Sequence, residues 1–291
     1  MRVREVPAEY LRCLGDAPWV DFSRRCLVSG GRAFVPVKKG FPFDEEVPER
    51  KPYGGRGFFL VGTTAVIRGK RPSDTELEEL ISWCRPKCVV WVRSIRGVMR
   101  LPDTFVLAGT PGDVCHHENG VIYHLDPVKV MFAQGNRLER QRMADTAKLH
   151  PGELVADMCA GIGYFAIPMA IEGARVHASE INPVAFDYLE RNIRANRVGE
   201  RVTAECGDCR TLLRGEYDRV ILGHFASSTM IASALDHVHP GSVLHVHSTG
   251  SMPPDQEETI SSSGLSAEVT TRIVKKFSPG KWHFVQDIVI R

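Results

Sequence analysis

Short apolar runs alternate with longer amphipathic segments throughout the second half of the chain. The apolar runs predict buried strands at 154–156, 175–179, 202–205, 219–222 and 243–246. The segments between them predict helices, the clearest at 183–196. Strands that alternate with helices are typical of a mostly parallel sheet covered by helices on both faces. Apolar runs at 265–274 and 282–290 flank a Ser-Pro-Gly turn and predict a C-terminal antiparallel hairpin.

The first half of the chain predicts a smaller, β-rich unit. Glycines and prolines interrupt the first 60 residues repeatedly, which leaves room only for short strands. Ser73 and Glu76 have the spacing of a capping box and mark the start of a helix. We therefore predict an N-terminal α+β domain at residues 1–127 and an α/β domain at residues 128–291.

Composition narrows the class of protein. A hydrophobic content of 43% over 291 residues suffices for a substantial core, and a net charge of +2 does not by itself indicate a nucleic-acid partner. No apolar run approaches the ~20 residues needed to cross a bilayer, and the N-terminus lacks a signal-peptide core. We expect a cytoplasmic protein with free thiols and no membrane contact.

One stretch is basic and contains no acid. The same stretch contains two tryptophans. Its basic residues are Arg85, Lys87, Arg93, Arg96 and Arg100. Two interpretations stay open: a face that contacts phosphates, or an ordinary solvated face around a buried strand.

A strand that turns through glycines into a helix is the first candidate ligand site. Asp157 follows the strand at 154–156, and Gly161 and Gly163 lie in the turn. Glycines let the backbone approach a ligand closely, and a helix start directs N–H groups at it. Asp157 either holds this glycine loop or meets the charged end of the ligand.

Polar residues also follow the next three strands. They are Glu180 and Asn182 after the second, Asp208 and Cys209 after the third, and His224 after the fourth. The carboxyl ends of such strands share one edge of the sheet, where ligands bind. Two acceptor oxygens suit Glu180 to the hydroxyls of a ribose. Asp208, or the backbone N–H of Cys209, suits an adenine edge. These residues predict a nucleoside-cofactor site, and an NAD enzyme would less naturally have Asn182, Asp208 and the terminal hairpin.

Cysteine and histidine spacing gives no metal pattern. Cys206 and Cys209 have C-x-x-C spacing without a second pair nearby, and the adjacent His116 and His117 lack further ligands at suitable spacing. We expect no metal.

The motifs in this order resemble class I S-adenosylmethionine-dependent transferases. The likeness is carried by Asp157-x-x-Ala-Gly-x-Gly, Glu180-x-Asn-Pro, Gly207-Asp208 and the hairpin. Two further motifs, Lys129-Val-Met-Phe132 and Glu139-Arg140-x-Arg142-Met143, are similar to the tRNA position-37 guanine-modifying group. The resemblance implies a Rossmann-like class I methyltransferase fold, S-adenosyl-L-methionine as donor, and the anticodon region of tRNA(Phe) as partner, with the N-terminal domain contacting tRNA.

The segment after the fourth strand separates the two branches of this group. The methyltransferase branch has an Asn-Pro motif there, whereas this chain has Gly223-His224-Phe225-Ala226. The resemblance thus implies an aminocarboxypropyltransferase that acts on C7 of 4-demethylwyosine at position 37 and releases 5′-methylthioadenosine. Guanine-37 N1-methylation is the alternative, and a tRNA-binding protein without turnover is a third interpretation.

The same resemblance implies roles for single residues. Arg140 contacts the donor, with its guanidinium fork on the donor's carboxylate. Glu180 holds the ribose, and Asp208 with Cys209 holds the adenine. His224 either removes the last proton from the base or only shapes the pocket. Where the family often has serine after Phe132, this chain has Ala133, so a hydroxyl contact is lost.

Overall fold

The computed structural model of the protein describes residues 1–15, 17–24, 26–47, 53–145 and 149–291. The chain forms two compact units, Met1–Gly54 and Gly55–Arg291. The division predicted at residues 127 and 128 lies inside the second unit, and it stays a prediction. Of the helices in the described ranges, none combines the length and apolarity that a bilayer span requires.

The first unit is built on a four-stranded antiparallel sheet. Its order is β2-β3-β1-β4, from the strands β1 (Arg2–Pro7), β2 (Leu27–Ser29), β3 (Arg32–Pro36) and β4 (Glu45–Glu46). The short helix η1 (Ala8–Cys13) follows β1. Val20 packs with Ala33 and Val35 of β3, and the three buried side chains form a small core.

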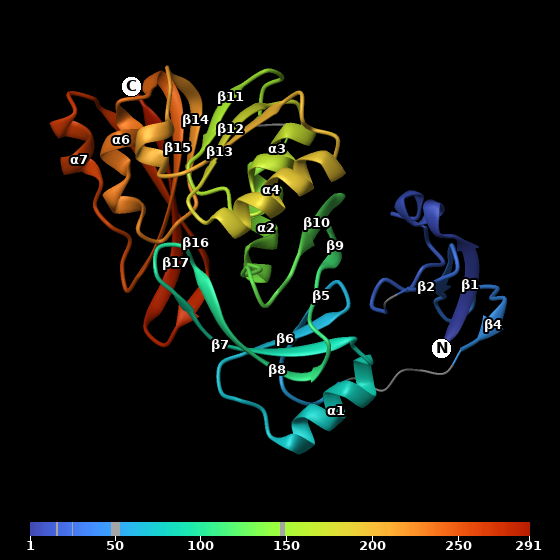
Figure 1. Ribbon diagram of the computed structural model, residues 1–291. Coiled ribbons are helices and arrows are strands. Elements are labelled where there is room, and N and C mark those ends of the chain that lie inside the picture. Colours follow the sequence, from blue (N-terminus) through green and yellow to red (C-terminus); the bar gives the residue numbers. More distant parts are fainter. Residues whose placement is uncertain (16, 25, 48–52, 146–148) are drawn as a thin grey trace. The chain divides into compact units, whose positions relative to one another are not determined.

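The second unit begins with another four-stranded sheet. It consists of β5 (Phe59–Val61), β6 (Thr64–Arg68), β7 (Cys88–Arg96) and β8 (Leu101–Gly109). The helix α1 (Asp74–Cys84) crosses from β6 to β7, which run parallel (Figure 1). The predicted capping box is present: Ser73 accepts from the N–H of Glu76, whose carboxylate accepts from the N–H of Ser73. The long β7–β8 pair turns at residues 97–100.

A hairpin follows, formed by β9 (Val114–Glu118) and β10 (Val121–Leu125). Its turn residues Asn119 and Gly120 have φ of 51° and 82°, as the Asn-Gly pair favours. The free edge of β10 is bonded to helix α4 (Pro183–Ala195). Asn192 accepts from the N–H of His124 at 2.6 Å and donates to its carbonyl at 3.2 Å. An asparagine side chain thus replaces a neighbouring strand.

The seven-stranded main sheet has the order β13-β12-β11-β14-β15-β17-β16. Its strands are β11 (Leu154–Asp157), β12 (Arg175–Glu180), β13 (Val202–Cys206), β14 (Tyr217–Leu222), β15 (Val238–Gly250), β16 (Ala267–Ser278) and β17 (Lys281–Ile290). The first five run parallel, and β17 pairs antiparallel with both β15 and β16. The predicted α/β class, with its C-terminal antiparallel hairpin and β-rich N-terminal part, is therefore confirmed.

Helices cover both faces of this sheet (Figure 1). Besides α4 they are α2 (Arg137–Met143), α3 (Ala166–Ile171), α5 (Cys209–Leu212), α6 (Ile231–Leu235) and α7 (Glu257–Ser262), with short turns η2 (Gln134–Asn136) and η3 (Ser227–Thr229). Successive strand residues alternate between two cores: Val155 packs on one face and Ala156 on the other. Strand order reverses between β11 and β14, which is the position where ligands bind in open α/β sheets.

Candidate active site

A cavity of about 760 Å³ lies at the carboxyl ends of the main sheet, within the second unit. Most of the predicted site residues line it: Arg140, Gly161, Glu180, Asn182, Asp208, Cys209 and His224. The opposite wall comes from β6 and the β7–β8 pair, including Arg68, Ser94 and Arg100. The basic stretch predicted from sequence therefore contributes Arg93 and Arg100 to this wall.

Asp157 lies behind the cavity wall and supports the glycine loop. Its carboxylate is fully buried and accepts from the N–H of Ala166 at 3.1 Å, where α3 begins. Burial raises the pKa of Asp157 to about 7. Gly163 has φ of 99°, and a Cβ there would lie 2.4 Å from Cδ1 of Ile167, so the loop needs glycine. Of the two roles predicted for Asp157, this geometry supports the loop-holding one.

Glu180 is held between two loops. One carboxylate oxygen accepts from the N–H of Gly161 and the other from the N–H of Asn182, both at 2.7 Å. Burial raises its pKa, while these two backbone donors lower it. Each carboxylate oxygen keeps a further lone pair. The side chain is therefore oriented and still able to accept two hydroxyl groups from the cavity.

Asn182 has a positioning role in this geometry. Its carbonyl oxygen caps α4 by accepting from the N–H of Val184 at 3.0 Å. Its amide donates to the carbonyl of Met99 at 3.2 Å, in the β7–β8 turn. Asn182 thus joins the turn that forms one wall of the cavity to the loop that forms the other.

Asp208 and Cys209 lie together after β13. Asp208 accepts from the N–H of Arg210 at 3.0 Å and pairs with its guanidinium, which lowers the pKa of the carboxyl group. Cys209 is buried, with its sulfur 3.5 Å from Sδ of Met230. Both cysteines of the C-x-x-C motif are free thiols. Within the described part of the chain, no group of His, Cys, Asp and Glu is arranged to hold a metal ion.

Arg140 is almost completely buried, and protein groups already engage its guanidinium. Nε donates to Glu118 at 2.8 Å and Nη1 donates to the carbonyl of Ala133 at 2.9 Å. The rings of Phe132 and Tyr164 lie 5.3 and 5.4 Å from the guanidinium carbon. Although Arg140 lines the cavity, its charge is compensated by Glu118, and its contact with a donor carboxylate stays a prediction. The sequence alone predicted no role for Glu118, which is the last residue of β9.

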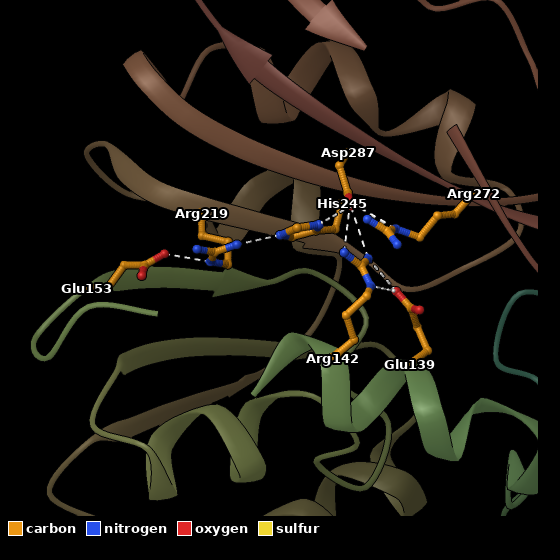
Figure 2. Close-up of polar contacts among 7 residues, drawn as sticks. All are labelled: Glu139, Arg142, Glu153, Arg219, His245, Arg272 and Asp287. Carbon is orange, nitrogen blue, oxygen red and sulfur yellow. Dashed lines mark hydrogen bonds and ion pairs between the residues drawn. The ribbon is translucent and has the colours of Figure 1, made fainter. Parts of the chain in front are cut away.

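A chain of polar contacts anchors α2, and with it Arg140, to the main sheet. Arg142 on α2 donates to Asp287 of β17 at 2.8 and 3.0 Å, and the two lie together in Figure 2. His245 of β15 contacts the same carboxylate at 2.6 Å through Nδ1. The pKa of Asp287 is therefore well below its usual range, with His245 and Arg142 as the cause. These contacts fix the position of α2 against the main sheet.

The same chain continues across the sheet (Figure 2). Arg219 donates to Nε2 of His245 at 2.6 Å, and its Nε donates to Glu153 at 2.5 Å. An arginine can only donate, so Nε2 of His245 carries a lone pair and Nδ1 donates to Asp287. His245 is therefore a buried, neutral link between strands, with its pKa lowered by burial.

His224 lines the cavity, and the backbone fixes the orientation of its ring. Nδ1 accepts from the N–H of Ala226 at 3.0 Å. A backbone N–H can only donate, so in the neutral ring the proton is on Nε2. Nε2 is buried and has no hydrogen-bond partner among the residues that the structure describes. Burial and the nearby Arg100 lower the pKa of His224. The geometry favours a hydrogen-bond donor, and the predicted role in proton removal stays a prediction.

Comparison with known proteins agrees with this architecture. A family model described as the TRM5/TYW2 methyltransferase domain matches residues 114–268. The chain is 37% identical over 214 residues to a tRNA(Phe) (4-demethylwyosine(37)-C(7)) aminocarboxypropyltransferase of Pyrococcus horikoshii. The aligned region covers 69% of this chain and 76% of that protein. The protein of the same name from Methanocaldococcus jannaschii is 32% identical over 241 residues, 78% of this chain and 95% of that protein.

Solved structures give the same relationship. The crystal structure of P. horikoshii TYW2 in complex with MeSAdo superposes with a TM-score of 0.70 at 30% identity, covering 81% of this chain and 91% of that one. Wild-type Trm5b from Pyrococcus abyssi superposes with a TM-score of 0.71 at 26% identity over 99% of this chain and 98% of that one. The family match and the identity to relatives show that this chain belongs to the TRM5/TYW2 family.

Proposed function

We propose that the protein transfers the 3-amino-3-carboxypropyl group of S-adenosylmethionine to C7 of 4-demethylwyosine at position 37 of tRNA(Phe). The observation that carries the proposal is the segment Gly223-His224-Phe225-Ala226, which follows β14 and lines the cavity. It replaces the Asn-Pro motif of the guanine-methylating branch. Two archaeal relatives at 37% and 32% identity are named for this aminocarboxypropyl transfer.

The residues of the cavity fit the nucleoside part of this donor. Glu180 is oriented by two backbone donors and offers two oxygens to a ribose. The buried Cys209 and the neighbouring Asp208 lie beyond the next strand, on the side where an adenine would lie. Gly161 has no side chain to separate its backbone from a ligand. These residues bind and orient the donor, and the site includes Arg140 and Asn182 as supports.

The product depends on orientation. The donor supplies a sulfonium with three attached carbons, each of which is electrophilic. The cavity therefore decides the reaction by the carbon that it places beside the nucleobase. In the proposed reaction a C–C bond forms at C7, the C–S bond to the aminocarboxypropyl group breaks with its electrons kept by sulfur, and the C7 proton is lost to solvent. His224, as a donor at Nε2, positions the tricyclic base.

Guanine-37 N1-methylation is the second candidate, and one observation favours it. The Trm5b structure covers 99% of this chain, whereas the TYW2 structure covers 81%. Within the cavity, however, the segment at 223–226 has no amide side chain that would engage a guanine edge. We therefore rank methylation second.

Position-specific labels distinguish the two reactions. The protein is incubated with S-adenosylmethionine labelled either at the carboxyl or at the methyl carbon, and with tRNA(Phe) that carries either 4-demethylwyosine or unmodified guanosine at position 37. We expect carboxyl label on the 4-demethylwyosine tRNA alone. Methyl label on the guanosine transcript would establish the second candidate. A protein that binds tRNA without turnover would transfer neither label.

A further inference from the structure

Three cations face the cavity without a carboxylate to neutralise them. Arg68 ends β6, Arg100 lies in the β7–β8 turn, and Lys275 lies on β16; all three line the cavity. Among the described residues, none of the three forms an ion pair with an acidic side chain, whereas Arg93 and Arg140 do. The cavity therefore holds positive charge that the protein itself does not compensate.

The three cationic groups converge on one short connector, residues 131–136. The contacts are Arg68 Nη2 to the carbonyl of Phe132 at 2.8 Å, Lys275 Nζ to Oδ1 of Asn136 at 2.6 Å, and Arg100 Nη2 to Sδ of Met131 at 3.7 Å. Each partner is neutral. A neutral acceptor orients a cation but does not offset its charge, so donors remain for an anionic ligand.

The charges also oppose one another. Burial, together with the nearby charges of Arg68 and Arg140, lowers the pKa of Lys275 to about 8. Burial and the proximity of Arg68 lower the pKa of Arg100. Arg100 has φ of 54°, a conformation that is unfavourable for residues other than glycine. An anion bound among the three would relieve this repulsion.

We propose that Arg68, Arg100 and Lys275 form an oxyanion subsite of the cavity. The inference rests on the proposed function, which supplies two oxyanions: the α-carboxylate of the aminocarboxypropyl group, and a phosphodiester beside the nucleotide that is modified. Because Glu118 already neutralises Arg140, this subsite is where the carboxylate finds uncompensated donors. It also suits the chemistry, since the carboxylate must move with the group that joins the base.

Binding measured by calorimetry tests the carboxylate arm without any turnover. The probes are S-adenosylmethionine and decarboxylated S-adenosylmethionine, which keeps the sulfonium and the ammonium group. The proteins are wild type, Lys275→Met, Arg100→Met and the matched control Lys276→Met, whose side chain is exposed and lies off the cavity wall. Thermal unfolding of each variant shows whether it is folded.

We expect Lys275→Met and Arg100→Met to raise the Kd of S-adenosylmethionine about tenfold, the scale of a charge-assisted hydrogen bond. The Kd of the decarboxylated probe should stay the same or fall, and the control should match wild type. Wild type also gives a readout that needs no variant. An oxyanion beside Lys275 raises its pKa, so binding at pH 8 should take up protons for S-adenosylmethionine and not for the decarboxylated probe.

The affinity for tRNA, measured at several salt concentrations, tests whether the oxyanion is a phosphodiester of the tRNA. If the oxyanion is a phosphodiester, Lys275→Met leaves both small probes unchanged, weakens tRNA binding, and makes the slope of log K against log salt less negative by about one. The subsite is overturned if the variants change neither arm and wild type takes up no protons. Failure of wild type to bind S-adenosylmethionine would instead contradict the proposed function, so the two failures are distinguishable.

Discussion

Arg140 and Glu118 form an ion pair inside the protein, with Nε of the arginine 2.8 Å from the carboxylate and side chains that are 2% and 5% exposed. The pair joins α2 to the β9–β10 hairpin and holds one wall of the cavity. It also changes the assignment of charges in the site, because a neutralised Arg140 leaves the donor's carboxylate to other cations.

Removing Glu118 should be strongly destabilising. Glu118→Ala leaves the Arg140 guanidinium buried without its charge partner, and loss of one member of such a pair costs about 3–5 kcal/mol. Urea denaturation should show a loss of this size in the free energy of unfolding. The control Glu268→Ala breaks the exposed pair with Arg291 and should cost less than about 1 kcal/mol. An equal loss in the free energy of unfolding for both variants would show that the buried pair stabilises the protein no more than an exposed one.

Glu180→Ala should weaken donor binding without unfolding the protein. The Kd of S-adenosylmethionine should rise at least tenfold, since one lost charge-assisted contact is worth about 1.4 kcal/mol or more. Calorimetry measures the constant, and Glu190→Ala on the exposed face of α4 is the control. An unchanged Kd for Glu180→Ala would remove this carboxylate from the site.

Two substitutions separate the possible roles of His224. Glutamine places an N–H donor near the position of Nε2 but cannot remove a proton. If His224 positions the base, His224→Gln should keep the rate of transfer within about tenfold of wild type, while His224→Ala loses more. If His224 is a general base, both variants should lose about 10²–10⁴-fold. Single-turnover rates on 4-demethylwyosine tRNA(Phe) decide between these results.

Buried histidines should make the protein less stable in mild acid. His247 and His283 are buried and bonded at 3.0 Å, and burial lowers the pKa of His283 to about 4. The unfolded chain binds its proton near the ordinary value of about 6.5. Stability from His283 is thus complete above pH 6.5 and is lost as pH falls from 6.5 to about 4, by about 3 kcal/mol in all.

Denaturation at several pH values measures this loss. His283→Gln should flatten the decline between pH 6.5 and 5, whereas His117→Gln, at an exposed position, should leave the slope unchanged. A wild-type protein whose free energy of unfolding is constant over this range would contradict the assignment of neutral, buried imidazoles.

Much of the fold was accessible from the sequence because it depends on local signals. The alternation of apolar runs predicted the parallel strands, and the Ser-Pro-Gly turn predicted the hairpin that completes the sheet. The strand-end rule brought Glu180, Asp208 and His224 to one cavity. These features need only periodicity and strand direction.

What could not be predicted depends on contacts between distant residues. Glu118 and Arg140 are 22 positions apart, and nothing in the sequence around either residue indicates that they pair. Asn192 accepts a hydrogen bond from the backbone of β10, 68 positions away in the sequence. In the sequence alone, Asn192 is indistinguishable from any other asparagine in a helix. Lys275 belongs to one strand of the C-terminal hairpin, and its sequence pattern predicts no contact with a ligand. Its position in the cavity wall follows only from the packing of β16.

The identity of the nucleoside left after one turnover tests the central claim most directly, since it reports which carbon–sulfur bond breaks. The protein is incubated with S-adenosylmethionine and 4-demethylwyosine tRNA(Phe). The released nucleoside is then separated, and mass spectrometry identifies and quantifies it. We predict 5′-methylthioadenosine in an amount equal to the modified tRNA. Release of S-adenosylhomocysteine would show that the methyl group was transferred and would contradict the account.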